Sequence, residues 1–207
     1  MNNGFKYPPH KFTVFFSPIE PVMRAIEIMG NIWKCFEKTT QTNDISAVLD
    51  SKFDEFIYDS GQTHVIYTPI SNRDITIFIS NQSDGASSLI HMSNKKMDLE
   101  SINLEISLPE NFYKRSAFTY YKNGKGIRVV YAMQDPNWIF FETGEPLSFE
   151  DVSLYKAKRK KDRMNKGIIV EYMRKLGVDL YDPNLWKNIG IAYEITEVKY
   201  PRKNQQT

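Results

Sequence analysis

Alternating apolar and polar positions predict β-strands along much of this chain. The clearest case is the stretch in which Ile102, Leu104 and Ile106 alternate with polar residues before Pro109. Runs rich in aromatic and β-branched residues predict further strands, because these side chains suit a pleated, half-buried surface. The polar stretch 39–44 is predicted to be a loop. The predicted strands of the second kind cover residues 11–17, 63–68, 74–80, 88–92, 138–142 and 189–200.

The pair Asn123-Gly124 predicts a tight β-hairpin in the middle of the chain. A two-residue type I′ turn needs positive φ at both central positions, which Asn and Gly tolerate. Lys122 then faces Lys125, and side-chain direction alternates along each strand. The strand over 138–142 follows; it is apolar on both faces and is therefore predicted to lie inside the sheet. The hairpin face predicted to be buried comprises Phe118, Tyr120, Ile127, Val129 and Tyr131.

Apolar residues at helical spacing predict three helices, over residues 20–37, 44–57 and 148–176. The last one begins with Ser148 as an N-cap candidate. Its pattern fits one continuous helix or two helices broken near 164–167.

Together these elements predict an α+β fold. We expect a curved, mostly antiparallel sheet of about eight strands, packed by two or three helices. The length of 207 residues fits a single domain with a substantial core. The polar connector 94–100 is the one place where the sequence suggests a weak domain boundary.

Composition indicates a globular protein, with 41% hydrophobic and 25% charged residues. The single cysteine, Cys35, rules out an internal disulfide framework. The N-terminus has no basic segment followed by an apolar run, so we expect a reducing, cytoplasmic setting. No stretch approaches the ~20 apolar residues that a membrane span needs, so we expect no membrane partner.

Charge is distributed unevenly along the chain. From Lys156 onward there are thirteen Lys and Arg against six Asp and Glu, although the whole chain carries a net charge of only +2. The densest part is KAKRKKDR, predicted to form a basic helix over 156–163. Such a surface attracts an acidic partner, either a protein or a nucleic acid. The candidate partner-binding residues are Lys156, Lys158, Arg159, Lys160, Lys161 and Arg163.

Signatures of catalysis are mostly missing from the sequence. Cys35 lies among apolar residues on a predicted helix, where a thiol is inert. His10, His64 and His91 have no metal-ligand spacing, and no C-x-x-C is present. The chain has no G-x-S-x-G elbow and no glycine-rich phosphate loop. We therefore expect no cofactor and no resident metal, and these patterns favour a protein without enzymatic activity.

One enzymatic alternative stays open. Glu197 and Lys199 lie two residues apart on a predicted strand, and Asp182 lies upstream. This combination resembles the constellation of the PD-(D/E)-x-K nucleases. The resemblance implies a Mg²⁺ ion held by the carboxylates, with the lysine assisting the attacking water.

The sequence therefore favours a non-enzymatic interaction protein that binds a protein partner. Its size, aromatic content and charge segregation resemble those of small bacterial proteins, including immunity proteins that neutralise a toxin domain. Nucleic-acid binding through 156–163 and the nuclease activity remain the alternatives. The sequence gives no indication of oligomeric state.

Overall fold

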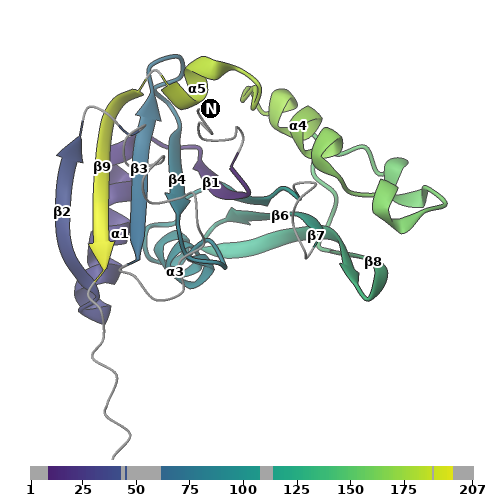
Figure 1. The fold of residues 1–207 in the computed structure, drawn as a ribbon, viewed down its shortest axis with the longest axis horizontal. Helices are drawn as coiled ribbons and strands as arrows, with labels where there is room; N and C mark the ends of the chain where they lie inside the picture. The colour runs from purple at the N-terminus through teal and green to yellow at the C-terminus, as the bar shows by residue number, and fades with distance from the viewer. Residues whose placement is uncertain (1–8, 43–44, 46–61, 108–113, 188, 198–207) are drawn as a thin grey trace, which may run out of the picture.

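The computed structural model describes residues 9–42, 45, 62–107, 114–187 and 189–197. Within them, nine strands form one open antiparallel sheet in the order β2-β9-β3-β4-β1-β5-β6-β7-β8 (Figure 1). The predicted α+β class, with its largely antiparallel sheet and few helices, is confirmed. The segment 94–100 joins a helix to β5 in the middle of this sheet.

The strands and helices have the following bounds. The strands are β1 Lys11–Phe15, β2 Phe36–Thr42, β3 Thr63–Pro69, β4 Thr76–Ser80, β5 Ser101–Glu105, β6 Arg115–Lys122, β7 Lys125–Asp135, β8 Asn137–Thr143 and β9 Ile189–Glu197. The helices are α1 Ile19–Trp33, α3 Ser87–Met97, α4 Lys166–Lys175 and the short α5 Pro183–Lys187, with 3₁₀ turns η1 Leu154–Lys156 and η2 Lys160–Asp162. The predicted helix over 44–57 lies outside the described residues except for Ile45, which is buried.

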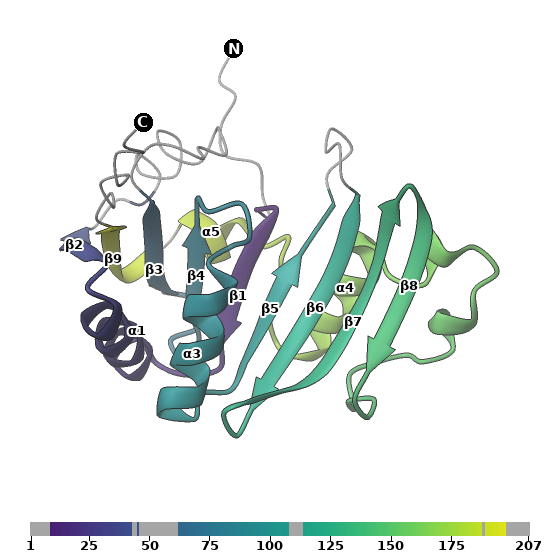
Figure 2. The ribbon, with the colours of Figure 1, turned by 90° about the horizontal axis from the view of Figure 1, so that it is seen from below.

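The two faces of the sheet carry two separate apolar cores. Helices α1 and α3 cover one face at β9, β3, β4 and β1, and Ile66 and Phe78 are among the strand residues that they bury. The segment from Phe149 to Trp186, which includes α4 and α5, covers the opposite face. Figure 2 shows α1 and α3 in front of the sheet and α4 behind it. We call the face that packs against residues 149–186 the inner face and the other the outer face.

Helix α1 follows the predicted apolar spacing but ends earlier than predicted. Lys34, with φ 55°, ends the helix at Trp33. The chain can then turn back because Gly30 lets the Phe36 ring lie against it; a Cβ on Gly30 would lie 2.1 Å from that ring. Residues 39–42 belong to β2, where threonine side chains suit a strand. The predicted loop over 39–44 was therefore wrong for these four residues.

The hairpin turn is confirmed, but its predicted register is wrong. Asn123 and Gly124 have φ of 52° and 65°, and Lys122 pairs with Lys125. A β-bulge follows, because Tyr121 pairs with Gly126 whereas Tyr120 pairs with Arg128. One extra residue in a strand moves every later side chain to the opposite face. The inner face consequently carries Phe118, Tyr120, Arg128, Val130 and Ala132, while Ile127, Val129 and Tyr131 lie on the outer side.

Two predicted strands have a different role in the structure. Residues 88–92 belong to helix α3 rather than to a strand, since a short apolar run does not distinguish the two by itself. The predicted interior strand 138–142 is β8, which lies at the edge of the sheet. Its side chains are half-buried or exposed, with Phe141 44% exposed.

The predicted helix over 148–176 exists only in its last part. Helix α4 begins at Lys166, capped by the Asn165 side chain, which accepts from the amide of Ile168. Residues 148–165 form turns and the two 3₁₀ segments instead. The run 156–163 has Ala157 as its only apolar residue, so a helix there would have no face to bury. The basic segment is therefore not a helix. Gly177, with φ 80°, ends α4 as expected.

No described helix combines the length and the apolar character needed to cross a membrane.

Candidate protein-binding surface at the β8 end of the sheet

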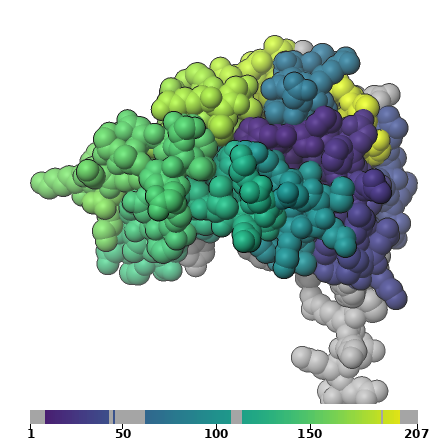
Figure 3. All heavy atoms as spheres, turned by 180° about the vertical axis from the view of Figure 1, so that it is seen from behind, coloured from purple at the N-terminus to yellow at the C-terminus, as the bar shows by residue number. Residues whose placement is uncertain are grey.

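The basic segment Lys156–Arg163 forms a projecting arm beside β8, which we call the basic arm (Figure 1). It carries all six candidate partner-binding cations and one acid, Asp162. Figure 3 shows this green part of the chain standing out from the body of the molecule. The arm belongs to the inner side, because its Arg163 lies against the ring of Phe140, which packs against the inner core.

Both ends of the arm are anchored in the core. Tyr155 is 5% exposed and Met164 is 1% exposed, so the arm leaves and re-enters the core within ten residues. Arg163 closes the loop, since its Nε donates to the carbonyl of Ala157 at 2.8 Å. The Arg163 guanidinium also lies 5.6 Å from the centre of the Phe140 ring on β8. Both ends of the arm are thus fixed to the rest of the fold.

Most cations of the arm are exposed and available. Arg159 pairs with Asp162 at 2.6 Å within the arm. The remaining four, Lys156, Lys158, Lys160 and Lys161, are exposed and form no ion pair with any residue that the structure describes. A partner can therefore bind these ammonium groups without displacing internal contacts.

The buried side chain of Arg128 holds the base of the arm to the sheet. It is 1% exposed, and its Nε and Nη2 donate to Glu150 at 2.9 and 2.8 Å. It also donates to Glu142 at 2.6 Å and to the carbonyl of Gly144 at 2.7 Å. The Tyr155 hydroxyl donates to the same Glu150 carboxylate at 2.6 Å. Strands β7 and β8, the loop after β8 and the first anchor of the arm thus meet at one guanidinium.

The ionisation states in this network follow from its contacts. Burial acts to lower the pKa of Arg128, but hydrogen bonds to Glu150 and Glu142 outweigh it and raise the pKa above its ordinary value. Burial and the hydrogen bond to Glu150 raise the pKa of Tyr155. Burial likewise raises the pKa of Tyr172, whose hydroxyl lies 3.2 Å from that of Tyr155. The cation and both phenols therefore keep their protons at neutral pH.

An uncovered apolar patch lies on the outer face of β7 and β8. No described helix covers this end of the outer face (Figure 2). Helix α3 reaches only the hairpin end, where the ring centres of His91 and Tyr121 lie 5.9 Å apart. Aromatic residues, Met and Arg are enriched at protein interfaces, and contiguous exposed apolar patches mark binding sites. The patch consists of Val129, Tyr131, Met133, Ile139 and Phe141.

The Tyr131 ring at the centre of the patch is contacted on two sides. Tyr131 and Phe141 pair directly across β7 and β8 and stack at 5.2 Å with an angle of 25°. Arg115 on β6 lies 4.9 Å from the centre of the Tyr131 ring. Neighbouring side chains therefore contact the Tyr131 ring from both flanking strands. These two contacts leave Tyr131 less accessible than Phe141 as a stacking surface for a nucleic acid base.

The residues of the nuclease alternative do not meet in one place among those that the structure describes. Asp182 precedes α5 and accepts from the amide of Asn184 at 2.9 Å. Glu197 is the last residue of β9. At ~3.3 Å per residue it lies about 26 Å from the first residue of that strand, which follows α5 in the chain. Lys199 lies outside the described residues. In the described part of the chain, no three His, Cys, Asp or Glu side chains form a metal-binding group.

Glu197 instead belongs to a buried hydrogen-bonded chain. It accepts from His64 Nε2 at 2.7 Å, and His64 Nδ1 lies 3.0 Å from the Ser80 hydroxyl. A Ser–His–Glu order is typical of nucleophilic catalysis. Here His64 is fully buried and stacked on Phe78 at 5.3 Å, and Ser80 is 5% exposed. A substrate could not reach this serine, so the chain of hydrogen bonds fastens β3, β4 and β9 together.

Cys35 is a buried thiol, as the sequence predicted. It is 5% exposed, and its pKa is raised, first by burial and then by the Glu197 charge. A thiol of this kind is a poor nucleophile.

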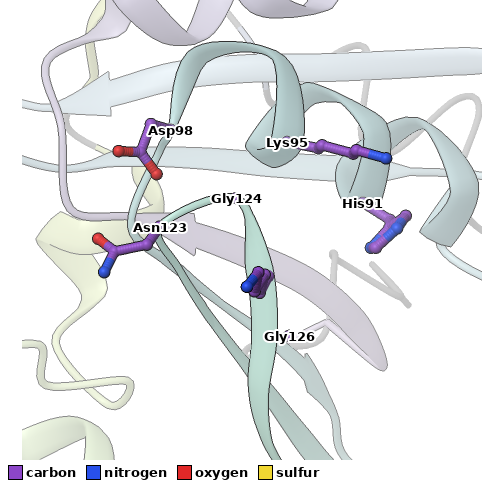
Figure 4. A pocket seen from close by; sticks show the side chains of 7 residues that line it. His91, Lys95, Asp98, Asn123, Gly124 and Gly126 are labelled. Atoms are coloured by element: carbon purple, nitrogen blue, oxygen red, sulfur yellow. The ribbon is translucent and has the colours of Figure 1, made fainter.

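A groove of about 550 Å³ lies between α3 and the β6–β7 hairpin (Figure 4). Lys95 and His91 lie on one side, Asp98 and Asn123 lie on the other, and the glycines of the hairpin lie between them. Lys95 stands in the last turn of α3, where a cation complements the helix dipole. The groove is open and its charges are mixed, so it defines no ligand.

Comparison of the chain with protein-family models, with curated proteins and with solved structures finds no match in any of the three. The assignment of a candidate surface at β8 therefore rests on the geometry of this chain alone. The sequence identified the cations of the arm but missed the apolar patch and Arg128. Both depend on the bulge after the hairpin, which no residue pattern indicated.

Proposed function

We propose that this protein is a non-enzymatic interaction protein that binds an acidic protein partner at the β8 end of its sheet. The observation that carries the proposal is the anchored basic arm, with four exposed lysines that have no described ion-pair partner. Because both ends of the arm are anchored, ordering the arm on binding costs less entropy than ordering an unattached segment would. Neutralisation of a toxin domain with an acidic surface is the particular role that we infer from the character of the sequence.

The apolar patch supports a protein as the partner. Positive charge alone would serve a nucleic acid equally well. A protein surface, in contrast, also matches a cluster of Tyr, Phe, Met and Ile next to those charges.

Charge reversal in the arm tests the proposal. Lys160→Glu together with Lys161→Glu should weaken binding of fluorescent poly-glutamate at about 0.1 M salt by at least about tenfold, because steering and attraction are both lost. The matched control is Lys95→Glu with Lys96→Glu, an adjacent exposed pair on α3. The control should change the affinity by less than about twofold, and an equal loss in both variants would contradict a specific site.

The same assay with single- and double-stranded DNA and RNA, with and without Mg²⁺, tests the alternatives. Tighter binding of nucleic acid than of poly-glutamate, abolished by the arm variant, would replace the proposal with nucleic-acid binding. Cleavage that requires Mg²⁺ and disappears in Glu197→Ala would establish the nuclease alternative.

A further inference from the structure

The free edge of β8 is the feature that the proposed function leaves unused. Within the described residues β8 pairs with β7 alone, so the outward N–H and C=O groups of its seven residues have no strand partner. Natural edge strands are usually blunted by lysine, proline, bulges or short length. Between Asn137 and Thr143 there is no lysine and no proline, and the register with β7 has no bulge. An edge of this kind is a template for a further strand.

The two sides of this edge differ chemically. On the outer side the edge presents Ile139 and Phe141, which belong to the apolar patch. On the inner side it presents Trp138, Phe140 and Glu142 next to the basic arm, whose Arg163 contacts the Phe140 ring. A strand added here would direct alternate side chains to the apolar patch and to the arm.

We propose that β8 accepts an extended segment of the acidic partner as a tenth strand, and that this segment alternates apolar and acidic residues. The inference rests on the proposed function and specifies its binding mode. Main-chain hydrogen bonds to β8 supply affinity, whereas the apolar patch and the arm lysines select the side chains. The apolar residues pack beside Ile139 and Phe141, and the acidic residues face the arm.

Charge complementarity selects this occupant over a second copy of the chain. Two-fold antiparallel pairing of β8 with itself keeps the inner faces of both copies on the same side. The two basic arms, each with six cations and one acid, would then project from the same face at the new junction. Like charges at such short range oppose association. An acidic segment, in contrast, is attracted to the basic arm.

Synthetic peptides about as long as β8 test the inference. One fluorescent peptide alternates Val and Glu, and a second has the same composition with all Glu residues at one end. Two further alternating peptides carry N-methyl groups on one or the other set of alternate amides. The alternating peptide should bind best. The peptide whose N-methyl groups lie on the amides that face β8 should lose about ten- to a hundredfold in affinity. It lacks two or three hydrogen bonds of about 1 kcal/mol each.

Two variants with equal exposure locate the site. Ile139 on β8 and Ile127 beside the hairpin are both 36% exposed. Ile139→Asn should weaken the alternating peptide by about fivefold or more, since an apolar contact is lost, whereas Ile127→Asn should leave it within about twofold. Hydrogen exchange of the β8 amides should slow on addition of the peptide.

The outcomes separate this inference from the proposed function. Equal binding of all four peptides, still dependent on Lys160 and Lys161, would overturn strand addition and leave the acidic-partner proposal standing. Absence of binding by every peptide would overturn strand addition as well, and the poly-glutamate assay would decide the proposed function. A dimer in analytical ultracentrifugation that Ile139→Asn dissociates would assign the edge to a second copy and contradict the inference.

Discussion

Replacement of Arg128 by methionine should be among the most destabilising single changes in this protein. Arg128 is 1% exposed, and the side chain of its partner Glu150 is not exposed at all. Methionine keeps the volume and the apolar stem but removes every donor. Among the described residues, Glu150 then retains only the amide of Leu147 and the hydroxyl of Tyr155 as donors. Removal of one partner of a buried ion pair costs about 3–5 kcal/mol, because an uncompensated charge stays in the interior.

Urea unfolding followed by tryptophan fluorescence measures this loss. The matched control is Arg115→Met, since Arg115 is 39% exposed at its side chain and lies 3.4 Å from Glu105. Arg115 itself is exposed, and Glu105 keeps Lys11 as a partner at 3.5 Å, so loss of this pair costs no more than about 1 kcal/mol. The double replacement Arg128→Met with Glu150→Leu should recover much of the stability, because it leaves no buried charge. A cost for Arg128→Met no greater than that for Arg115→Met would refute the reasoning.

Three further predictions concern the same region and the opposite end of the sheet. Gly144→Ala should reduce the free energy of unfolding by about 2–4 kcal/mol, since Gly144 has φ +84° and an added Cβ would lie 1.9 Å from the carbonyl oxygen of Ile127; unchanged urea unfolding would contradict this. The phenols of Tyr155 and Tyr172 have a raised pKa in the folded state, so their contribution to stability is complete below the unfolded value of about 10 and is lost as pH rises above it. Unfolding in urea at pH 9 and pH 11, with tyrosinate absorbance as a second readout, should therefore show lower stability at pH 11, and equal stability would count against this account. The Cys35 thiol should react with a disulfide reagent at pH 8 at least about a hundredfold more slowly in the folded protein than in guanidinium, because its pKa is raised and it is buried; similar rates would show an accessible thiol.

Local patterns predicted the elements whose signal lies within a few residues. The Asn123-Gly124 turn needs positive φ at both positions and the structure has it. The alternation of Ile102 and Leu104 with polar residues predicted β5, and both residues are buried as expected. In each case the period of the side chains determines the element without help from distant parts of the chain.

The candidate site was predictable only in its charges. The cations of the basic arm follow from composition, but their conformation does not. Ser148 and Gly177 are suitable cap residues for a helix over 148–176. Residues 156–163, however, offer no apolar face that could pack against the sheet. The buried residues Tyr155 and Met164 flank the arm, which contains the 3₁₀ turn η2 and no α-helix.

Local patterns are therefore sufficient to predict the class of fold, the hairpin turn and the concentration of positive charge after residue 155. The face that each residue of the central hairpin occupies depends on long-range packing. A pattern that is apolar at Ile127 and Val129 favoured one register, but the bulge exchanged the two faces. This register buries the Arg128 side chain. Burial of the guanidinium is tolerated because it pairs with Glu150, which lies in the loop after β8. Since that partner comes from a distant part of the chain, no local pattern could have revealed the register or the uncovered patch at β8.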